Sequence, residues 1–125
     1  MPGKELKGVR VLLVEDQMIV AMQIEDMLQA AGCKVVGPVG TLQAAVAMAR
    51  EEPLDAAVLD VNLDGDKVFP AAEELHSRGI PFILATGYGE QALPDQWRHR
   101  PRLSKPFRRE QLEQLLSSVA GRSDA

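Results

Sequence analysis

The sequence of 125 residues predicts one α/β domain with a five-stranded parallel sheet. Two observations lead to this fold class. Short, continuous apolar runs, which are typical of strands covered on both faces, alternate with segments whose apolar residues have helical spacing. Polar or charged residues follow or close four of these runs. In a parallel sheet such groups meet in one crevice, because the carboxyl ends of the strands lie at the same edge.

The first half of the chain alternates strands with helices that have clear start and stop signals. Apolar side chains near helical spacing define the first helix, and Gly32 ends it. Thr41 is a suitable N-cap for the second helix, which Pro53 ends. The expected elements are a strand over residues 9–14, a helix over 17–31, a strand over 34–38 and a helix over 42–52.

The second half repeats this alternation with one exception. The expected elements are strands over residues 55–60, 80–85 and 102–104, a helix within 66–78 beyond Pro70 that ends at Gly79, and a last helix over 107–119. The exception is the connection 87–101, which contains two glycines, two prolines and few apolar residues at helical spacing. Parallel strands require a crossover, so we expect a helix there that is short or mobile.

Composition and charge narrow the class of protein. The net charge of −4 disfavours a general binder of nucleic acid or of an anionic membrane. The single Cys33 cannot form an internal disulfide, and no apolar stretch approaches the ~20 residues that a bilayer requires. The N-terminus lacks the pattern of a signal peptide. We therefore expect a cytoplasmic domain over residues 8–120, with frayed ends at 1–7 and 121–125.

Polar groups at the ends of the expected strands define the candidate site. Glu15 and Asp16 follow the first strand directly, and Asp60 closes the third. Thr86 and Lys105 follow the fourth and fifth strands. A dinucleotide fold has a glycine-rich turn after its first strand, whereas paired carboxylates repel phosphate and attract a hard cation such as Mg²⁺. The set predicts a site for a hard cation and a phosphoryl group.

Two other patterns have simpler interpretations. Residues 60–65 match the first half of a calcium-binding EF-hand loop, but Ala71 stands where a bidentate Glu is required and a strand precedes the loop, so we reject this interpretation. A cluster of basic residues is either a solvated face or a docking surface for an acidic partner. Its members are Arg98, His99, Arg100, Arg102, Lys105, Arg108 and Arg109.

Together these residues resemble the receiver domain of bacterial two-component response regulators. The resemblance covers about residues 8–120 and rests on four motifs in order, which are Val11-Leu12-Leu13-Val14-Glu15-Asp16, Asp60, Ala85-Thr86-Gly87 and Lys105-Pro106-Phe107. Residues 84–89 resemble in part the Phe-Ala-Thr-Gly-x-Tyr signature of single-domain alphaproteobacterial receivers, although Leu84 replaces the Phe and Tyr88 falls one place early. The fold implied is a flavodoxin-like (βα)5 three-layer sandwich.

The resemblance implies a signalling function rather than an enzyme acting on an external substrate. The domain would take a phosphoryl group from a sensor histidine kinase or a histidine phosphotransfer protein onto Asp60. It would promote its own phosphorylation and dephosphorylation, and it would switch binding to a downstream protein target. Nucleic acid and membranes are not expected as direct partners.

The resemblance also implies roles for the other site residues. Asp16, Asp60 and the backbone carbonyl of Asn62 would bind Mg²⁺, with Glu15 acting through water. Thr86, Gly87 and Lys105 would contact the phosphoryl oxygens, and the peptide bond before Pro106 would be cis, which only X-Pro bonds adopt at low cost.

Three features depart from the family pattern. Arg102 occupies the usual place of the switch aromatic, and Asp64 occupies that of a proline. The stretch between Thr86 and Lys105 is short. Tyr88 is the only ring near Thr86 in the sequence, so we expect it to substitute in the switch.

Two other functions stay open. A haloacid-dehalogenase-like phosphatase also phosphorylates an Asp beside Mg²⁺, but it has a second Asp where this chain has Asn62. Turnover of a small phosphate ester would favour it. An interaction module that is never phosphorylated is the other alternative, and failure of an acyl phosphate to modify Asp60 would favour it. Whether the chain acts alone or belongs to a larger regulator or hybrid kinase also stays open.

Overall fold

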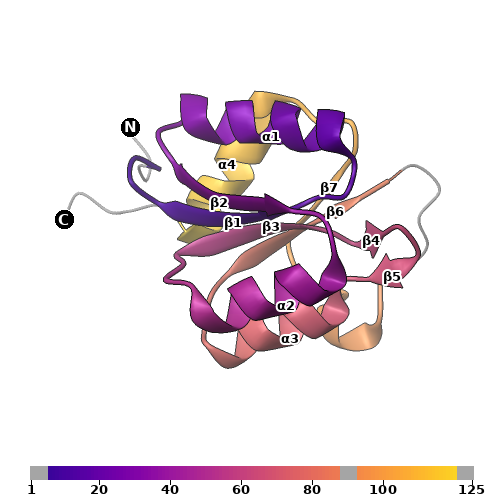
Figure 1. Ribbon diagram of the computed structural model, residues 1–125. Helices are drawn as coiled ribbons and strands as arrows, with labels where there is room; N and C mark the ends of the chain where they lie inside the picture. Colours follow the sequence, from indigo (N-terminus) through magenta and orange to yellow (C-terminus); the bar gives the residue numbers. More distant parts are fainter. Residues whose placement is uncertain (1–5, 88–92, 121–125) are drawn as a thin grey trace.

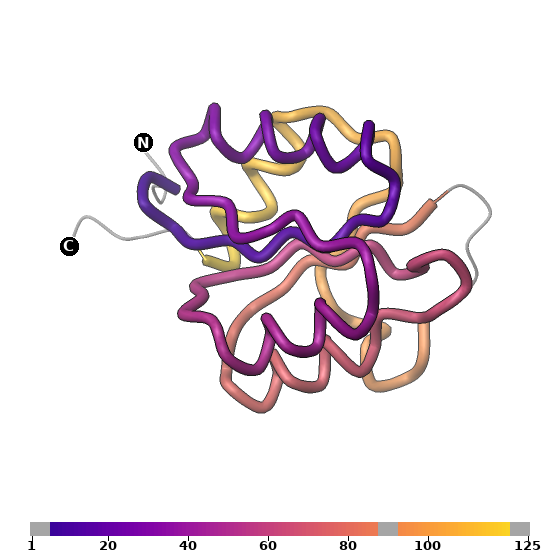
Figure 2. The backbone as a smooth tube through the Cα atoms, viewed as in Figure 1, coloured from indigo at the N-terminus to yellow at the C-terminus, as the bar shows by residue number. Residues whose placement is uncertain are grey.

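The computed structural model describes residues 6–87 and 93–120, which form a parallel sheet between two layers of helices (Figures 1 and 2). The sheet has five strands in the order β2-β1-β3-β6-β7, so the expected fold class is confirmed. The strands are β1 Arg10–Val14, β2 Lys34–Val39, β3 Ala56–Asp60, β6 Phe82–Thr86 and β7 Arg102–Ser104. The helices that cover it are α1 Met18–Ala30, α2 Leu42–Glu51, α3 Phe69–Ser77 and α4 Arg109–Ala120.

The central strands are apolar along their whole length because helices cover both faces of the sheet. Successive residues of a strand point to opposite faces. Leu12 of β1 accordingly packs in the cluster on the α2 and α3 side, and Leu13 packs in the cluster on the α1 and α4 side. All five residues of β3 and of β6 are buried, whereas the edge strands β2 and β7 are partly exposed. Figure 1 shows α1 and α4 over one face and α2 and α3 over the other.

The ends of the helices follow local signals. The Thr41 hydroxyl accepts a hydrogen bond from the Ala44 N–H (3.2 Å) and caps α2, as expected. Gly32 has a φ of 94° just after α1, a backbone conformation that favours glycine. At the N-terminus Leu6, which the sequence places in a frayed segment, is buried against the α1 and α4 cluster.

A short antiparallel hairpin after β3 was not expected from the sequence. Its strands are β4 Asn62–Leu63 and β5 Asp66–Lys67, with Asp64 and Gly65 at the turn. Both turn residues have positive φ (51° and 95°), as two-residue hairpin turns with Asp-Gly require. The helix expected beyond Pro70 begins at Phe69 as α3. Two-residue strands are too short for an alternating pattern to indicate them.

The connection between β6 and β7 contains a short helix, as expected. Its described part has one 3₁₀ turn, η1 Asp95–Trp97. The expectation that few apolar side chains hold this connection is wrong for Leu93 and Trp97, which are 5% and 3% exposed. The Trp97 ring packs edge-on against Phe82 of β6, with ring centroids 5.5 Å apart, and the Arg100 guanidinium lies 4.6 Å from the centre of the Phe82 ring. Trp97 is an anchor in the core.

No helix in the described part of the chain is long and apolar enough to cross a bilayer.

The first prediction concerns this anchor. Trp97→Ala should lower the free energy of unfolding by about 3–5 kcal/mol, because it leaves a cavity against Phe82. His99→Ala, at an exposed position in the same connection, should change it by less than about 0.5 kcal/mol. Urea unfolding followed by circular dichroism measures both values without relying on the tryptophan. A loss below about 1 kcal/mol for Trp97→Ala would mean that this connection adds little to the core.

Candidate functional site

The strand registers bring the polar strand ends to one edge of the sheet. Val14 of β1 lies beside Leu59 of β3, so Glu15 is level with Asp60. Asp60 lies beside Ala85, and the pairing of Thr86 with Ser104 places Lys105 just beyond β7. Four strands that are distant in the sequence therefore deliver their polar residues to one place. Buried apolar side chains on both faces keep this register, because a slip by one residue would turn each side chain to the other face.

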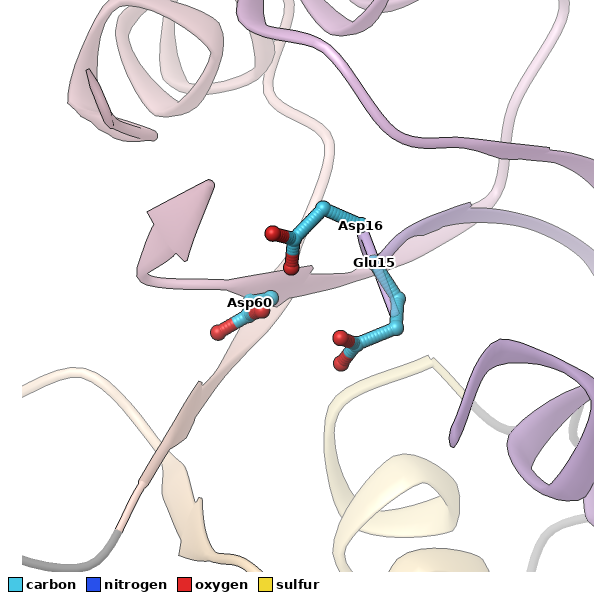
Figure 3. A group of neighbouring side chains, drawn as sticks. All are labelled: Glu15, Asp16 and Asp60. Atoms are coloured by element: carbon cyan, nitrogen blue, oxygen red, sulfur yellow. The ribbon is translucent and has the colours of Figure 1, made fainter. Parts of the chain in front are cut away.

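Three carboxylates meet at this edge (Figure 3). Glu15, Asp16 and Asp60 each offer an oxygen atom, and these atoms lie within 4.8 Å of one another. Glu15 and Asp60 are only 3% and 4% exposed, whereas Asp16 is exposed. Burial of two carboxylates is costly unless hydrogen bonds or opposite charges compensate it.

Lys105 supplies the compensating charge. Its Nζ lies 3.0 Å from Glu15 Oε1 and 3.4 Å from Asp60 Oδ2. Backbone N–H groups satisfy the remaining oxygens, since Gln17 N–H donates to Glu15 Oε2 (3.1 Å) and Asn62 N–H donates to Asp60 Oδ1 (3.3 Å). The pairing of Glu15 with Lys105 was not foreseen from the sequence. Ninety positions separate the two residues, and no local pattern indicates their contact.

Thr86 and Gly87 lie where the sequence places them, at the end of β6. The Thr86 side chain is buried, and its hydroxyl donates to the Leu103 carbonyl of β7 at 3.4 Å. The Thr86 carbonyl accepts the Lys105 N–H at 2.7 Å, and the Lys105-Pro106 bond is cis. Arg102 is exposed on the edge strand β7. Tyr88, the expected switch ring, lies outside the described residues.

An open cavity of about 320 Å³ lies above these groups. Its lining contains the expected residues Asp16, Asp60, Asn62, Gly87 and Lys105. Gln17, Asp64 and Gly65 also line it and were not assigned to the site from the sequence. The Asp64-Gly65 pair is a hairpin-turn signal that could have placed these two residues beside Asp60.

The electrostatics favour the arrival of a cation. Burial and the nearby Glu15 carboxylate raise the pKa of Asp60 to about 7, although Lys105 and the Asn62 N–H act in the opposite direction. Burial lowers the pKa of Lys105, but its hydrogen bond to Glu15 and the attraction of Asp60 outweigh this effect and leave it raised. One ammonium group therefore does not balance three carboxylates. Clustered carboxylate oxygens are the ligands that Mg²⁺ and other hard cations take, so this donor set fits such an ion.

A second hollow borders the site on the α1 side. A groove of about 270 Å³ runs between α1 and the segment that follows β7, and Val20, Ile24 and Phe107 are among its lining residues. Gln17 and Lys105 line both this groove and the acidic cavity. The same helix also exposes Met18, Ile19 and Met22, which are 76%, 74% and 56% exposed. Such an exposed apolar patch is a common mark of a protein interface.

Comparisons with known proteins agree with this geometry. The family model described as the response regulator receiver domain matches residues 11–117. The solution structure of SdrG from Sphingomonas melonis Fr1 is 39% identical, with a TM-score of 0.81 over 90% of this chain and 96% of SdrG. The receiver domain of the sensor histidine kinase PA1611 from Pseudomonas aeruginosa PAO1 is 29% identical, with a TM-score of 0.77 over 90% and 98% of the two chains. That crystal structure has a magnesium ion coordinated in its active-site cleft.

A longer relative contains a similar segment. The phyllosphere-induced regulator PhyR from Methylorubrum extorquens is 29% identical over 125 residues, a match that covers 94% of this chain and 46% of PhyR. The chain spans less than half the length of the curated relatives it matches.

The second prediction is a pH dependence of stability in metal-free protein. The pKa of Asp60 is raised from 3.8 to about 7, so its contribution to stability is fully present below pH ~4 and is lost as the pH rises through 7. Asp60→Asn removes this charge and should raise the free energy of unfolding at pH 8 by about 1–2 kcal/mol, a value reduced for the openness of the cavity. The gain should vanish near pH 4.

Urea unfolding in EDTA at both pH values tests this dependence. Asp16→Asn is the matched control, because its carboxylate belongs to the same cluster but is exposed, and it should give a smaller gain. An equal gain from Asp60→Asn at pH 4 and pH 8 would contradict the assignment of the raised pKa to Asp60.

Proposed function

The chain belongs to the response regulator receiver domains, the phosphoacceptor domains of two-component signalling, and we propose that Asp60 is the carboxylate that accepts the phosphoryl group. One observation carries this proposal. Asp60 is the buried carboxylate at the end of the central strand β3, it lines the open cavity, and an ammonium group lies 3.4 Å away. Membership of this family favours a phosphoacceptor function over a haloacid-dehalogenase-like phosphatase.

The chemistry is an in-line transfer between two nucleophiles. An oxygen of ionised Asp60 attacks the phosphorus of a phosphohistidine, and the P–N bond breaks as the P–O bond forms. The electron pair of the broken bond returns to the imidazole. Lys105 and the Asn62 N–H favour the ionised carboxylate that this attack requires. The protein contributes positioning and charge neutralisation, which are the main contributions to catalysis of phosphoryl transfer.

Mg²⁺ would be held by Asp16, Asp60 and the backbone carbonyl of Asn62. A bound Mg²⁺ would supply positive charge against the oxygens of the transferring group. Glu15 would act on the ion through water, a role supported by its direct pairing with Lys105. The magnesium ion in the similar PA1611 receiver domain supports this choice of metal.

Thr86 would report the phosphorylated state to the edge of the sheet. Its hydroxyl now donates to the Leu103 carbonyl of β7, and turning toward a phosphoryl oxygen would break this contact. Gly87 N–H and Lys105 would bind the other phosphoryl oxygens. Arg102 is exposed on the same edge strand, so a change at Thr86 would alter the surface that a downstream protein reads. Tyr88 remains our candidate for the switch aromatic.

The phosphodonor would dock on the apolar patch of α1. Met18, Ile19 and Met22 are exposed on α1, and other residues of this helix line a groove that shares Gln17 and Lys105 with the acidic cavity. A histidine kinase or phosphotransfer protein seated there would bring its phosphohistidine over Asp60. The same site would also promote dephosphorylation, because a water molecule attacking the phosphoryl group in line would be next to the same charged residues.

The third prediction is that Asp60 is the only phosphorylated residue and that the reaction requires Mg²⁺. Intact mass spectrometry after incubation with acetyl phosphate should show one phosphoryl adduct, which is lost in Asp60→Asn and in EDTA. Asp26→Asn, at an exposed position on α1, should retain it. An adduct that survives Asp60→Asn, or that forms fully in EDTA, would refute the assignment. A wild-type protein that neither acetyl phosphate nor a histidine donor modifies would instead be an interaction module.

The fourth prediction separates donor docking from the chemistry. Ile19→Asp places a charge in the apolar patch and should slow transfer from a phosphorylated histidine kinase at least about tenfold, since an interface residue that loses ~1.4 kcal/mol has this effect. Its reaction with acetyl phosphate should be unchanged. Gln29→Asp adds the same charge at an exposed position farther along α1 and serves as the control. If Ile19→Asp slows the reaction equally with both donors, the substitution damages the phosphorylation site itself, and the docking proposal is contradicted.

A further inference from the structure

The hairpin that follows Asp60 is firmly attached to the core. Val61, Leu63 and Val68 are at most 3% exposed and belong to the cluster beneath the sheet. The Val68 N–H donates to the Val61 carbonyl at 2.9 Å, which closes the base of the hairpin. At the tip, the Asn62 side-chain oxygen accepts the Gly65 N–H at 3.2 Å. The turn residues therefore have a defined place relative to Asp60.

The position of the turn adds one more carboxylate to the lining of the acidic cavity. Asp64 lines the cavity together with Asp16 and Asp60. Asp64 is not one of the three residues whose ligand atoms lie within 4.8 Å of one another, so it is not positioned as a direct ligand. Its charge adds to a set that is already negative, because among the described lining residues Lys105 is the one cation and both Glu15 and Asp60 engage it.

We propose that the negative charge of Asp64 strengthens cation binding at Asp16 and Asp60 electrostatically, without contact between Asp64 and the ion. The proposal rests on the Mg²⁺ site of the proposed function. Three carboxylates and one ammonium leave two negative charges, which a divalent ion balances, and Asp64 adds a third. An exposed unit charge acting on a divalent ion through water should change the dissociation constant about three-fold at low ionic strength, and less than about two-fold at 150 mM salt.

Asp64 offers a substitution that removes the charge and keeps the backbone. Its φ is 51°, a left-handed conformation that Asn and Gly accept with little strain and that Ala does not. Asp64→Asn and Asp64→Gly should therefore fold as the wild type does, which thermal unfolding checks. Asp66→Asn is the matched control. Asp66 lies on the same hairpin and carries the same charge, but it is outside the cavity lining.

The experiment is a calorimetric titration of each full-length variant with MgCl₂ at 10 mM and 150 mM salt. Asp64→Asn and Asp64→Gly should both bind about three-fold more weakly at low salt, with the difference shrinking at high salt, while Asp66→Asn stays within about 1.5-fold of the wild type. Asp64 variants that bind as the wild type does, while Asp16→Asn loses binding, would overturn this inference and leave the proposed metal site standing. An Asp16→Asn variant that binds as the wild type does would overturn the metal site itself.

Discussion

Two buried carboxylates, Glu15 and Asp60, share one ammonium group, and the rest of the site depends on holding these three together. Each comes from a different strand end, and the cost of burying two like charges falls if the third strand end delivers Lys105 within reach. The parallel sheet meets this requirement. Its buried central strands set a register that the charged groups could not set for themselves.

The same arrangement connects the site to two surfaces, the apolar groove next to α1 and the edge strand β7. On one side, Lys105 lines both the acidic cavity and the apolar groove next to α1, so the two hollows share a residue. On the other side, Thr86 joins β6 to the edge strand β7 through its hydroxyl. Trp97 and Arg100 fasten the described part of the preceding connection to Phe82 of β6. A change at Thr86 would therefore act on β7, an edge strand that is partly exposed and that follows a connection packed against the core.

The hairpin β4–β5 adds rigidity where the chain leaves Asp60. Its apolar residues are buried, its tip is closed by the Asn62 amide, and Asp64 stands at the cavity. Figure 1 shows the hairpin beyond the carboxyl ends of the strands, on the side of the molecule away from both termini. The hairpin that follows Asp60 is thus a fixed part of the cavity wall.

The sequence alone determined the fold class, the five strands and the residues at their ends. A continuous apolar run followed by a polar or charged residue is a local pattern, and it can be recognised without knowing which segments pack together. Thr41 and Gly32 likewise mark helix ends through their own backbone preferences. Tertiary structure decided the contacts between distant segments. The Glu15–Lys105 pair joins residues 90 positions apart, and the burial of Trp97 depends on Phe82 and not on its own neighbours. The α1 residues Met18 and Ile19 are apolar, yet they are exposed because the helix turns the face with Ala21 and Ile24, and not theirs, toward the core. Such outcomes depend on which surfaces meet after the chain has folded, which is information that no local pattern contains.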